Sequence, residues 1–406
     1  MALIVQKYGG TSVGTIERIK NVADRVINEY EKGNKIVVVV SAMGDTTDEL
    51  CGLMNQITDN PNPRDVDMLL TTGEQISIAL LSMAIHEKGY NSISLTGSQV
   101  KIQTSDHHNR AEIRDIDNSR IHNELEDGKI VVIAGFQGIN SQGDFTTLGR
   151  GASDTTAVAL AASLKADCCE IYSDVDGIYT TDPRIVPEAS KLDYISYEEM
   201  LELASLGAKV LHPRSVELAK YYNIKLYIAS SFNYKPGTLV GGMKDMENRK
   251  NVTGLTADKD EVKITIEQLP DQPGIAGRLF TSLADNGINV DMIIQNLQHD
   301  QKNDITFTIN NSDLKKGSLF IEKIAAELGA GNLFIDTDVA KVSIVGAGMI
   351  TTPGIAAKMF SILGNENINI QMITTSDIKV SCLIDEKDAE RAVRILHRSF
   401  ELDCAI

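Results

Sequence analysis

A glycine-rich segment near the N-terminus, residues 7–12 (Lys-Tyr-Gly-Gly-Thr-Ser), has the residue types of an anion-binding loop. It follows an apolar run and precedes apolar residues at helical spacing, so it should connect a strand to a helix. Paired glycines let backbone N–H groups approach an anion, the helix N-terminus adds its dipole, and Lys7 adds a point charge. The segment lacks the spacing of a Walker loop. Phosphate binding and an ordinary glycine-rich turn both fit.

A second glycine-rich loop, residues 148–156, carries Arg150, Ser153 and Asp154. The guanidinium of Arg150 can hold a carboxylate with two hydrogen bonds. Ser153 and Asp154 could cap the helix that follows, which would aim its positive end at the loop. A solvated loop with a plain cap is the alternative, but the density of these groups favours a binding loop.

Residues 173–184 leave a predicted strand and enter a loop that suits a nucleotide. Tyr179 offers a ring and a hydroxyl, and Arg184 offers a charge. Asp and Pro are equally typical of a plain connection, so composition leaves both interpretations open. Three shorter segments share the strand-to-helix position: residues 41–47, 72–75 and 135–138.

Three other motifs give weaker indications of function. Gly346-Ala347-Gly348 resembles the start of a dinucleotide fingerprint, but its third glycine is misplaced. His107-His108 has no second ligand cluster at a workable spacing, so no metal site is expected. The five cysteines are sparse and form no Cys-x-x-Cys pair, which favours reduced thiols in a cytoplasmic protein.

The elements that must position these residues alternate between strand and helix over residues 1–240. β-branched runs at 36–40 and 130–134 predict strands buried on both faces, while 68–85 and 154–164 have helical patterns. Such alternation predicts an α/β fold with a mostly parallel sheet and helices on both sides. Ligands should lie beyond the carboxyl ends of the strands.

The last third of the chain contains an internal repeat. Residues 273–293 match residues 353–373 at 10 of 21 positions, and each copy as a whole, with the strand before the match, has strand–helix–strand–strand–helix order. That order is ferredoxin-like. We expect a linker at 241–261, one unit at 262–340 and a second at 341–399.

Composition narrows the function classes. The chain has 406 residues with 56 acidic and 39 basic side chains, a formal charge of −17, which opposes general nucleic-acid binding. Trp is absent and aromatic residues are 5%, so stacking platforms for single strands are not expected. Membrane association is not expected either, because no run approaches about 20 apolar residues.

Taken together, these motifs resemble the aspartokinases of the amino-acid kinase family, and the repeat resembles tandem ACT domains. The resemblance implies an amino-acid kinase-type α/β sandwich plus two ferredoxin-like (βαββαβ) ACT domains. It implies phosphorylation of the side-chain carboxylate of L-aspartate by ATP with Mg²⁺, inhibition by lysine or threonine, and a homodimer or higher oligomer formed through the ACT domains. In this family the second ACT unit is inserted into the first, so residues 400–406 could supply the last strand of the first unit.

The resemblance also implies residue roles. The catalytic pair would be Lys7 and Asp154. Aspartate recognition would fall on Ser41, Thr47, Glu74, Phe136, Arg150 and Ser153. Nucleotide contacts would come from Lys7, Gly9, Gly10, Ser173, Asp174, Tyr179, Arg184 and Lys209. The effector site would use Asp271, Gly274, Ile275, Ala276 and Gln295, with Asn369 from a facing second unit. Ala152 and Ser98 depart from the family pattern, without removing a group that the chemistry requires.

This chemistry explains why no catalytic histidine is evident. The acceptor carboxylate, with a reference pKa of about 3.9, is ionised at pH 7 and needs no general base. The alternatives are a sister kinase acting on glutamate, acetylglutamate or UMP, which would usually lack the repeat, and a non-catalytic ACT sensor of amino acids. Intact Lys7, Arg150 and Asp154 argue against the sensor.

Overall fold

The structure, a computed structural model, describes residues 1–149, 151–208, 210–243, 251–297 and 302–403. The chain divides into two compact units. The first comprises Met1–Ile178 and Lys191–Met246, and the second comprises Tyr179–Ser190 and Glu247–Ile406. A short segment of the expected catalytic region therefore belongs to the second unit.

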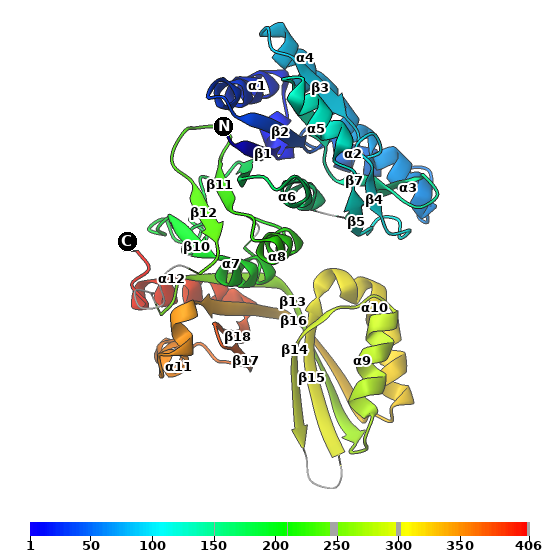
Figure 1. Ribbon diagram of the computed structural model, residues 1–406. Helices are drawn as coiled ribbons and strands as arrows, with labels where there is room; N and C mark the ends of the chain where they lie inside the picture. Colours follow the sequence, from blue (N-terminus) through cyan, green and yellow to red (C-terminus); the bar gives the residue numbers. More distant parts are fainter. Residues whose placement is uncertain (150, 209, 244–250, 298–301, 404–406) are drawn as a thin grey trace. The chain divides into compact units, whose positions relative to one another are not determined.

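The first unit is built on an eight-stranded sheet in the order β10-β12-β11-β9-β1-β2-β6-β3 (Figure 1). Its neighbouring strands are parallel except for β11 and β12. The strands are β1 (Leu3–Tyr8), β2 (Lys35–Val40), β3 (Ser92–Leu95), β6 (Ile130–Ala134), β9 (Cys168–Ser173), β10 (Tyr194–Ser196), β11 (Leu226–Ser230) and β12 (Thr238–Gly241). This confirms the predicted parallel sheet.

Helices cover this sheet as the apolar patterns require. Helices α1 (Ile16–Glu31) and α4 (Thr72–Glu87) pack together and share one apolar core with β1, β2 and β6. Helix α6 (Ala152–Leu164) packs against β1, β2 and α8 (Pro213–Tyr222). Its small alanines allow a close approach, and nearly all of it is buried. The other helices are η1 (Gly10–Val13), α2 (Thr46–Asn55), α3 (Pro63–Leu70), α5 (Ser119–Glu126) and α7 (Tyr197–Ser205).

A small second sheet of this unit was not expected from the sequence. It has the order β5-β4-β7-β8. Its strands are β4 (Ile102–Thr104), β5 (Ile113–Ile116), β7 (Gln137–Ile139) and β8 (Phe145–Thr147). Each has only three or four residues, which is too short for an alternating pattern to be recognised. Strands β7 and β8 lie between Phe136 and the loop that begins at Leu148, and so they hold two of the predicted binding segments.

The sequence was expected to contain no segment long and apolar enough to cross a membrane. The helical stretch Pro63–Glu87 corrects this expectation, because its length and composition alone would allow it to do so. Half of its most apolar 18-residue segment is buried within the protein. Its second part, α4, packs on α1 and the central sheet. This burial is what a core helix shows.

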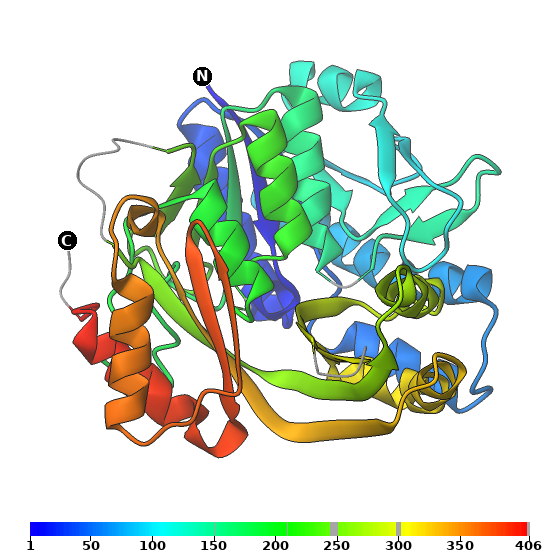
Figure 2. The same cartoon turned by 90° about the horizontal axis from the view of Figure 1, so that it is seen from below.

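The second unit has a six-stranded sheet in the order β14-β15-β13-β16-β18-β17. Its strands are β13 (Gly254–Pro270), β14 (Val290–Leu297), β15 (Lys302–Asn310), β16 (Asn332–Val345), β17 (Met372–Ser376) and β18 (Lys379–Asp385). Helices α9 (Ile275–Asp285) and α10 (Asn311–Glu327) cover one half, and α11 (Ile355–Asn365) and α12 (Ala389–Ser399) cover the other. The two helix pairs lie at opposite ends of the sheet (Figure 2). Short 3₁₀ turns, η2 (Ala347–Ile350) and η3 (Glu386–Asp388), precede α11 and α12.

Two boundary expectations were wrong. The linker expected at 241–261 is shorter, because β13 begins at Gly254 and its first part pairs with residues 341–345 of β16. The last strand of the first repeat is the first part of β16, which pairs with β13. Of the residues expected to supply this strand, 400–403 form a turn, and 404–406 lie outside the description. The polar composition of the first part of β13 concealed this strand.

Residues 179–190 are held to the second unit by several contacts. Val186 lies in the apolar core beneath α11 and α12. Thr180 Oγ1 is 2.9 Å from Nε2 of the buried His397, and the Thr180 carbonyl accepts from Leu255 N–H at 2.8 Å. Arg394 donates to the Ile185 carbonyl at 3.1 Å. This segment is therefore part of the repeat-containing unit, although the sequence placed it in the catalytic region.

Candidate active site

The predicted catalytic pair forms an ion pair. Lys7 comes from the end of β1 and Asp154 from the first turn of α6, and Lys7 Nζ lies 2.7 Å from Asp154 Oδ1. Their side chains are only 11% and 10% exposed. A buried ammonium needs such a partner, because desolvation of an isolated charge is costly. The pair fixes a cation at the carboxyl end of the central strand.

The first glycine loop closes tightly around this cation. A Cβ on Gly10 would lie 2.9 Å from the Ala42 carbonyl oxygen, so a side chain there would force the backbone to move. Gly44 N–H donates to the Gly10 carbonyl at 3.0 Å, and Gly9 N–H donates to the Tyr172 carbonyl at 3.2 Å. The structure therefore brings the glycine loop together with residues 41–47 and the end of β9.

The segment after β6 lies against the start of α6. A Cβ on Gly135 would lie 2.8 Å from Ser153 Oγ, so glycine permits this approach. Phe136 has a φ of 68°, a left-handed conformation that is unusual for an aromatic residue. Its N–H donates to Thr156 Oγ1 at 3.1 Å. Strained backbone of this kind clusters at functional sites, which supports the assignment of Phe136 and Ser153.

Glu74 is a buried carboxylate near the glycine loop. It is 3% exposed, and its Oε1 accepts from Ala42 N–H at 3.1 Å. Its Oε2 is buried without a hydrogen-bond partner among the described residues. Burial raises the pKa of Glu74 to about 7. The residue thus offers an unsatisfied acceptor beside Ser41 and the first turn of α2, which contains Thr47.

The predicted nucleotide residues divide between the two units. Ser173 ends β9 and Asp174 follows it in the first unit, whereas Tyr179 and Arg184 belong to the second unit. Arg184 forms a bidentate ion pair with Asp182, in which Nε lies 3.0 Å from Oδ1 and Nη2 lies 2.6 Å from Oδ2. Arg150 and Lys209, expected at the substrate and the nucleotide, lie outside the described residues.

Sequence reasoning missed a buried network next to the substrate segments. Asp67 of α3 is fully buried and accepts from Thr147 Oγ1 at 2.6 Å and from Asn109 N–H at 3.2 Å. Its Oδ2 is 2.6 Å from His108 Nδ1. Asp67 thereby ties α3 to the end of β8, three residues before Arg150. The adjacent histidines were the only sequence signal, and they were considered only as metal ligands.

The described residues contain no group of three or more His, Cys, Asp or Glu side chains placed to hold a metal ion. A Mg²⁺ ion carried by nucleotide phosphates needs only one or two carboxylates from the protein. The exposed Asp174 and the carboxylate of Asp154 are compatible with that demand.

The predicted effector residues of the first repeat lie around the start of α9. Gly274 precedes this helix with a φ of 96°, a conformation that favours glycine. Asp271 accepts from Asn303 Nδ2 at 2.9 Å. Asn303 is 3% exposed, and its Oδ1 has no hydrogen-bond partner among the residues that the structure describes. Gln295 lies on β14, whereas Asn369 lies in the second repeat.

Comparisons with known proteins agree with this architecture. Residues 2–230 match the amino acid kinase family, and residues 262–323 and 342–400 each match an ACT domain. The chain is 52% identical to the aspartokinase of Pseudomonas aeruginosa over 405 residues, which cover 99% of this chain and 98% of the relative. It is 50% identical over 402 residues to aspartokinase 2 of Bacillus subtilis, with the same coverage.

Solved structures show the same similarity. Escherichia coli aspartokinase III in complex with aspartate and ADP superimposes with a TM-score of 0.82 at 27% identity, covering 98% of this chain and 99% of the other. The complex of that enzyme with lysine and aspartate gives a TM-score of 0.76 at 26% identity, with the same coverage.

Proposed function

We infer that this chain, which belongs to the amino acid kinase family and carries two ACT domains, is an ATP-dependent kinase that phosphorylates L-aspartate. This conclusion rests on one observation: the chain is about 50% identical to aspartate kinases over nearly its whole length and theirs. The product is 4-phospho-L-aspartate, formed in the first step of lysine, threonine and methionine biosynthesis. ACT-mediated feedback by an amino acid is consistent with these relatives.

The Lys7–Asp154 pair supports a mechanism based on charge neutralisation. The acceptor carboxylate is ionised at neutral pH, so no base has to remove a proton. The enzyme must instead hold two anions in line and stabilise the charge on the transferring phosphoryl group. We propose that Lys7 supplies this charge with the N–H groups of Gly9 and Gly10, and that Asp154 orients Lys7.

We propose that aspartate binds between the segments that surround Glu74 and Ser153. The unsatisfied Oε2 of Glu74 suits the substrate ammonium, because binding would give it the partner that it lacks. Ser41, Thr47, Phe136 and Ser153 would complete the pocket. Arg150 would hold a substrate carboxylate, an assignment that rests on the sequence motif alone.

The nucleotide assignment also remains a proposal. Ser173 and Asp174 would contact ATP from the end of β9, and Mg²⁺ bound to the phosphates would neutralise part of their charge. Tyr179, Arg184 and Lys209 would complete the nucleotide site. The proximity of the glycine loop to the end of β9 supports Ser173 and Asp174 in particular.

We propose that lysine, with threonine as the next candidate, binds at the start of α9. Asp271 would take the effector ammonium, while the N–H groups of Gly274, Ile275 and Ala276 would receive its carboxylate. Gln295 and a partner's Asn369 would complete the site. The unpartnered Oδ1 of Asn303, the residue that holds Asp271, supports an additional polar ligand there. A homodimer or higher oligomer through the ACT domains and a cytoplasmic location remain predictions.

A panel of acceptors tests the proposed activity. The purified full-length protein is incubated with ATP and Mg²⁺, and ADP release is measured with L-aspartate, L-glutamate, N-acetyl-L-glutamate and UMP. We expect release above the acceptor-free rate with L-aspartate only. Release with another acceptor in place of aspartate would identify a sister kinase, and no release with any acceptor would indicate a non-catalytic sensor.

A further inference from the structure

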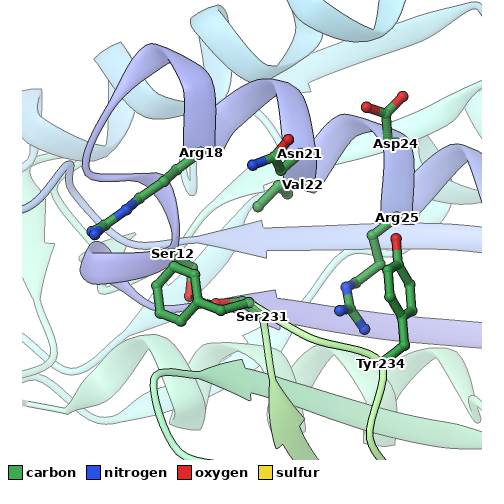
Figure 3. Close-up of a pocket in the computed structure, with 9 residues that line it drawn as sticks. Ser12, Arg18, Asn21, Val22, Asp24, Arg25, Ser231 and Tyr234 are labelled. Atoms are coloured by element: carbon green, nitrogen blue, oxygen red, sulfur yellow. Dashed lines mark hydrogen bonds between the residues drawn. The ribbon is translucent and has the colours of Figure 1, made fainter.

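A pocket of about 220 Å³ lies in the first unit, between α1 and the loop that follows β11 (Figure 3). From α1 it is lined by Arg18, Asn21, Val22 and Arg25, whose spacing of three, four and seven residues places them on one face of the helix. Ser231, Phe232 and Tyr234 line the opposite side. None of these residues belongs to the proposed ATP, aspartate or effector sites.

Arg25 is fixed within the wall of this pocket. It is 8% exposed, and its guanidinium lies 4.8 Å from the ring centre of Tyr172 and 4.3 Å from that of Tyr234. It also donates to the Asn233 carbonyl. Among the described residues it makes no ion pair, although the chain is strongly acidic and most buried arginines pair with carboxylates. The ring contacts and the carbonyl hold the group in place without cancelling its charge.

Arg18 supplies a second positive charge at the other end of the pocket. Its guanidinium lies 5.0 Å from the ring centre of Phe232, and Nη1 donates to the Thr11 carbonyl at 2.8 Å. It too makes no ion pair within the described part of the chain. Asp24 is the one acidic side chain among the described lining residues, and its carboxylate is 2.6 Å from Lys88 Nζ. The side chains that line the pocket therefore carry a net positive charge.

Two serine hydroxyls of the lining are already hydrogen-bonded. Ser12 Oγ donates to Ser231 Oγ at 2.8 Å, and Ser231 Oγ donates to the Ser173 carbonyl at 3.0 Å. The protons of these two serines are thus already used, so the donors left for a ligand are the two guanidiniums, the amide of Asn21 and the phenol of Tyr234. Ser12 follows Gly10 by two positions in the sequence, so one lining residue of the pocket belongs to the glycine-rich segment 7–12.

The size and the donors of the pocket define a ligand class. A volume of about 220 Å³ equals roughly seven water molecules at about 30 Å³ each, enough for a compact ion with its hydration. Two guanidinium groups with an amide match the several acceptor oxygens of a phosphate group. We propose that this pocket is a binding site for a small phosphate-type oxyanion, separate from the catalytic centre.

Calorimetric titration of the full-length protein with inorganic phosphate tests this proposal. The protein is kept at low ionic strength with a saturating non-hydrolysable ATP analogue, Mg²⁺ and L-aspartate, so that the phosphate and aspartate positions of the proposed catalytic site are filled. We expect one phosphate per chain for the parent. Arg18→Gln should bind phosphate at least about tenfold more weakly, because it loses a charge-assisted donor pair. Lys20→Gln removes one positive charge from an exposed position of the same helix and should bind like the parent.

Thermal unfolding with and without phosphate separates binding from a purely structural role of the arginines. Phosphate should raise the Tm of the parent and of Lys20→Gln, but not of Arg18→Gln. Absence of binding by the parent, or phosphate affinity of Arg18→Gln equal to that of the parent, would overturn the proposal. Displacement of phosphate by malonate at equal concentration would overturn the phosphate-type assignment, because it would identify a dicarboxylate site.

Discussion

Lys7 and Asp154 depend on each other for their burial, so the catalytic and structural effects of a single change must be separated. Lys7→Ala should lower kcat at least a hundredfold, about 3 kcal/mol of lost transition-state stabilisation. It should also destabilise the fold by leaving the Asp154 carboxylate buried without its cation. Stopped-time ADP assays and thermal unfolding measure the two effects.

The double variant Lys7→Ala/Asp154→Asn provides the control. It removes the uncompensated charge and should recover stability while staying inactive. Lys20→Ala, an exposed lysine on α1, should retain the parent's turnover. Near-normal kcat in Lys7→Ala would mean that Lys7 does not serve the transferring phosphoryl group.

Glu74 should make stability depend on pH. Its folded-state pKa of about 7 lies above the unfolded value of about 4.3, so the protonated form favours folding. That contribution is complete below about pH 4 and is lost as the pH rises through 7. Relative to Glu74→Gln, the parent's free energy of unfolding should fall between pH 5 and 8, by at most about 3 kcal/mol.

Denaturant unfolding at several pH values, without ligand and with saturating aspartate, checks this expectation. Aspartate should reduce the pH dependence, because its ammonium would stabilise the ionised carboxylate. Identical slopes for the parent and Glu74→Gln would show that Glu74 does not titrate in this range.

Asp67 links three elements of the first unit: α3, the loop after β4 and the end of β8. Asp67→Asn loses the charge that holds His108 and weakens three hydrogen bonds. The aspartate KM should rise about tenfold while the ATP KM stays within about twofold, because β8 leads into the substrate loop. Asp65→Asn, on the same helix but 74% exposed, is the matched control. An equal rise of both KM values would contradict a role specific to the substrate loop.

The sequence predicted the elements with strong patterns and missed those without them. The β-branched runs at 36–40 and 130–134 correspond to β2 and β6, and the alanine-rich run corresponds to α6. The glycine loops marked Lys7 and Asp154 separately, because anion chemistry leaves a local signature, and the family resemblance implied that the two act as a pair. The short strands of the small sheet and the polar first part of β13 carry no such periodicity. Asp67 and the pocket between Arg18 and Arg25 arise from contacts distant in sequence, which one chain without its fold does not reveal.

The path of the chain between its two units bears on regulation. Residues 179–190 leave the first unit after Ile178, pack in the second, and return at Lys191. They carry Tyr179 and Arg184, both proposed to contact ATP. A change in the ACT unit would therefore reach the nucleotide through a covalently continuous segment. Such coupling typically amounts to about 1–3 kcal/mol.

Val186→Ala tests this connection by loosening the segment in its core. Val393→Ala removes the same two methyl groups from the same apolar core but lies on α12. We expect Val186→Ala to raise the ATP KM at least about threefold and to weaken lysine inhibition, whereas Val393→Ala should mainly lower the Tm. Equal effects of the two variants on the ATP KM and on inhibition would contradict a special role of the segment.

The central claim is phosphoryl transfer to the side-chain carboxylate of aspartate, and trapping of the product tests it most directly. Hydroxylamine converts an acyl phosphate into a stable hydroxamate whose position shows which carboxylate was phosphorylated. With ATP, Mg²⁺ and L-aspartate, the parent should yield the side-chain hydroxamate, and Lys7→Ala should yield less than about one hundredth as much at equal times. Formation of the α-hydroxamate, of a glutamate hydroxamate when glutamate replaces aspartate, or of no hydroxamate at all would contradict the account.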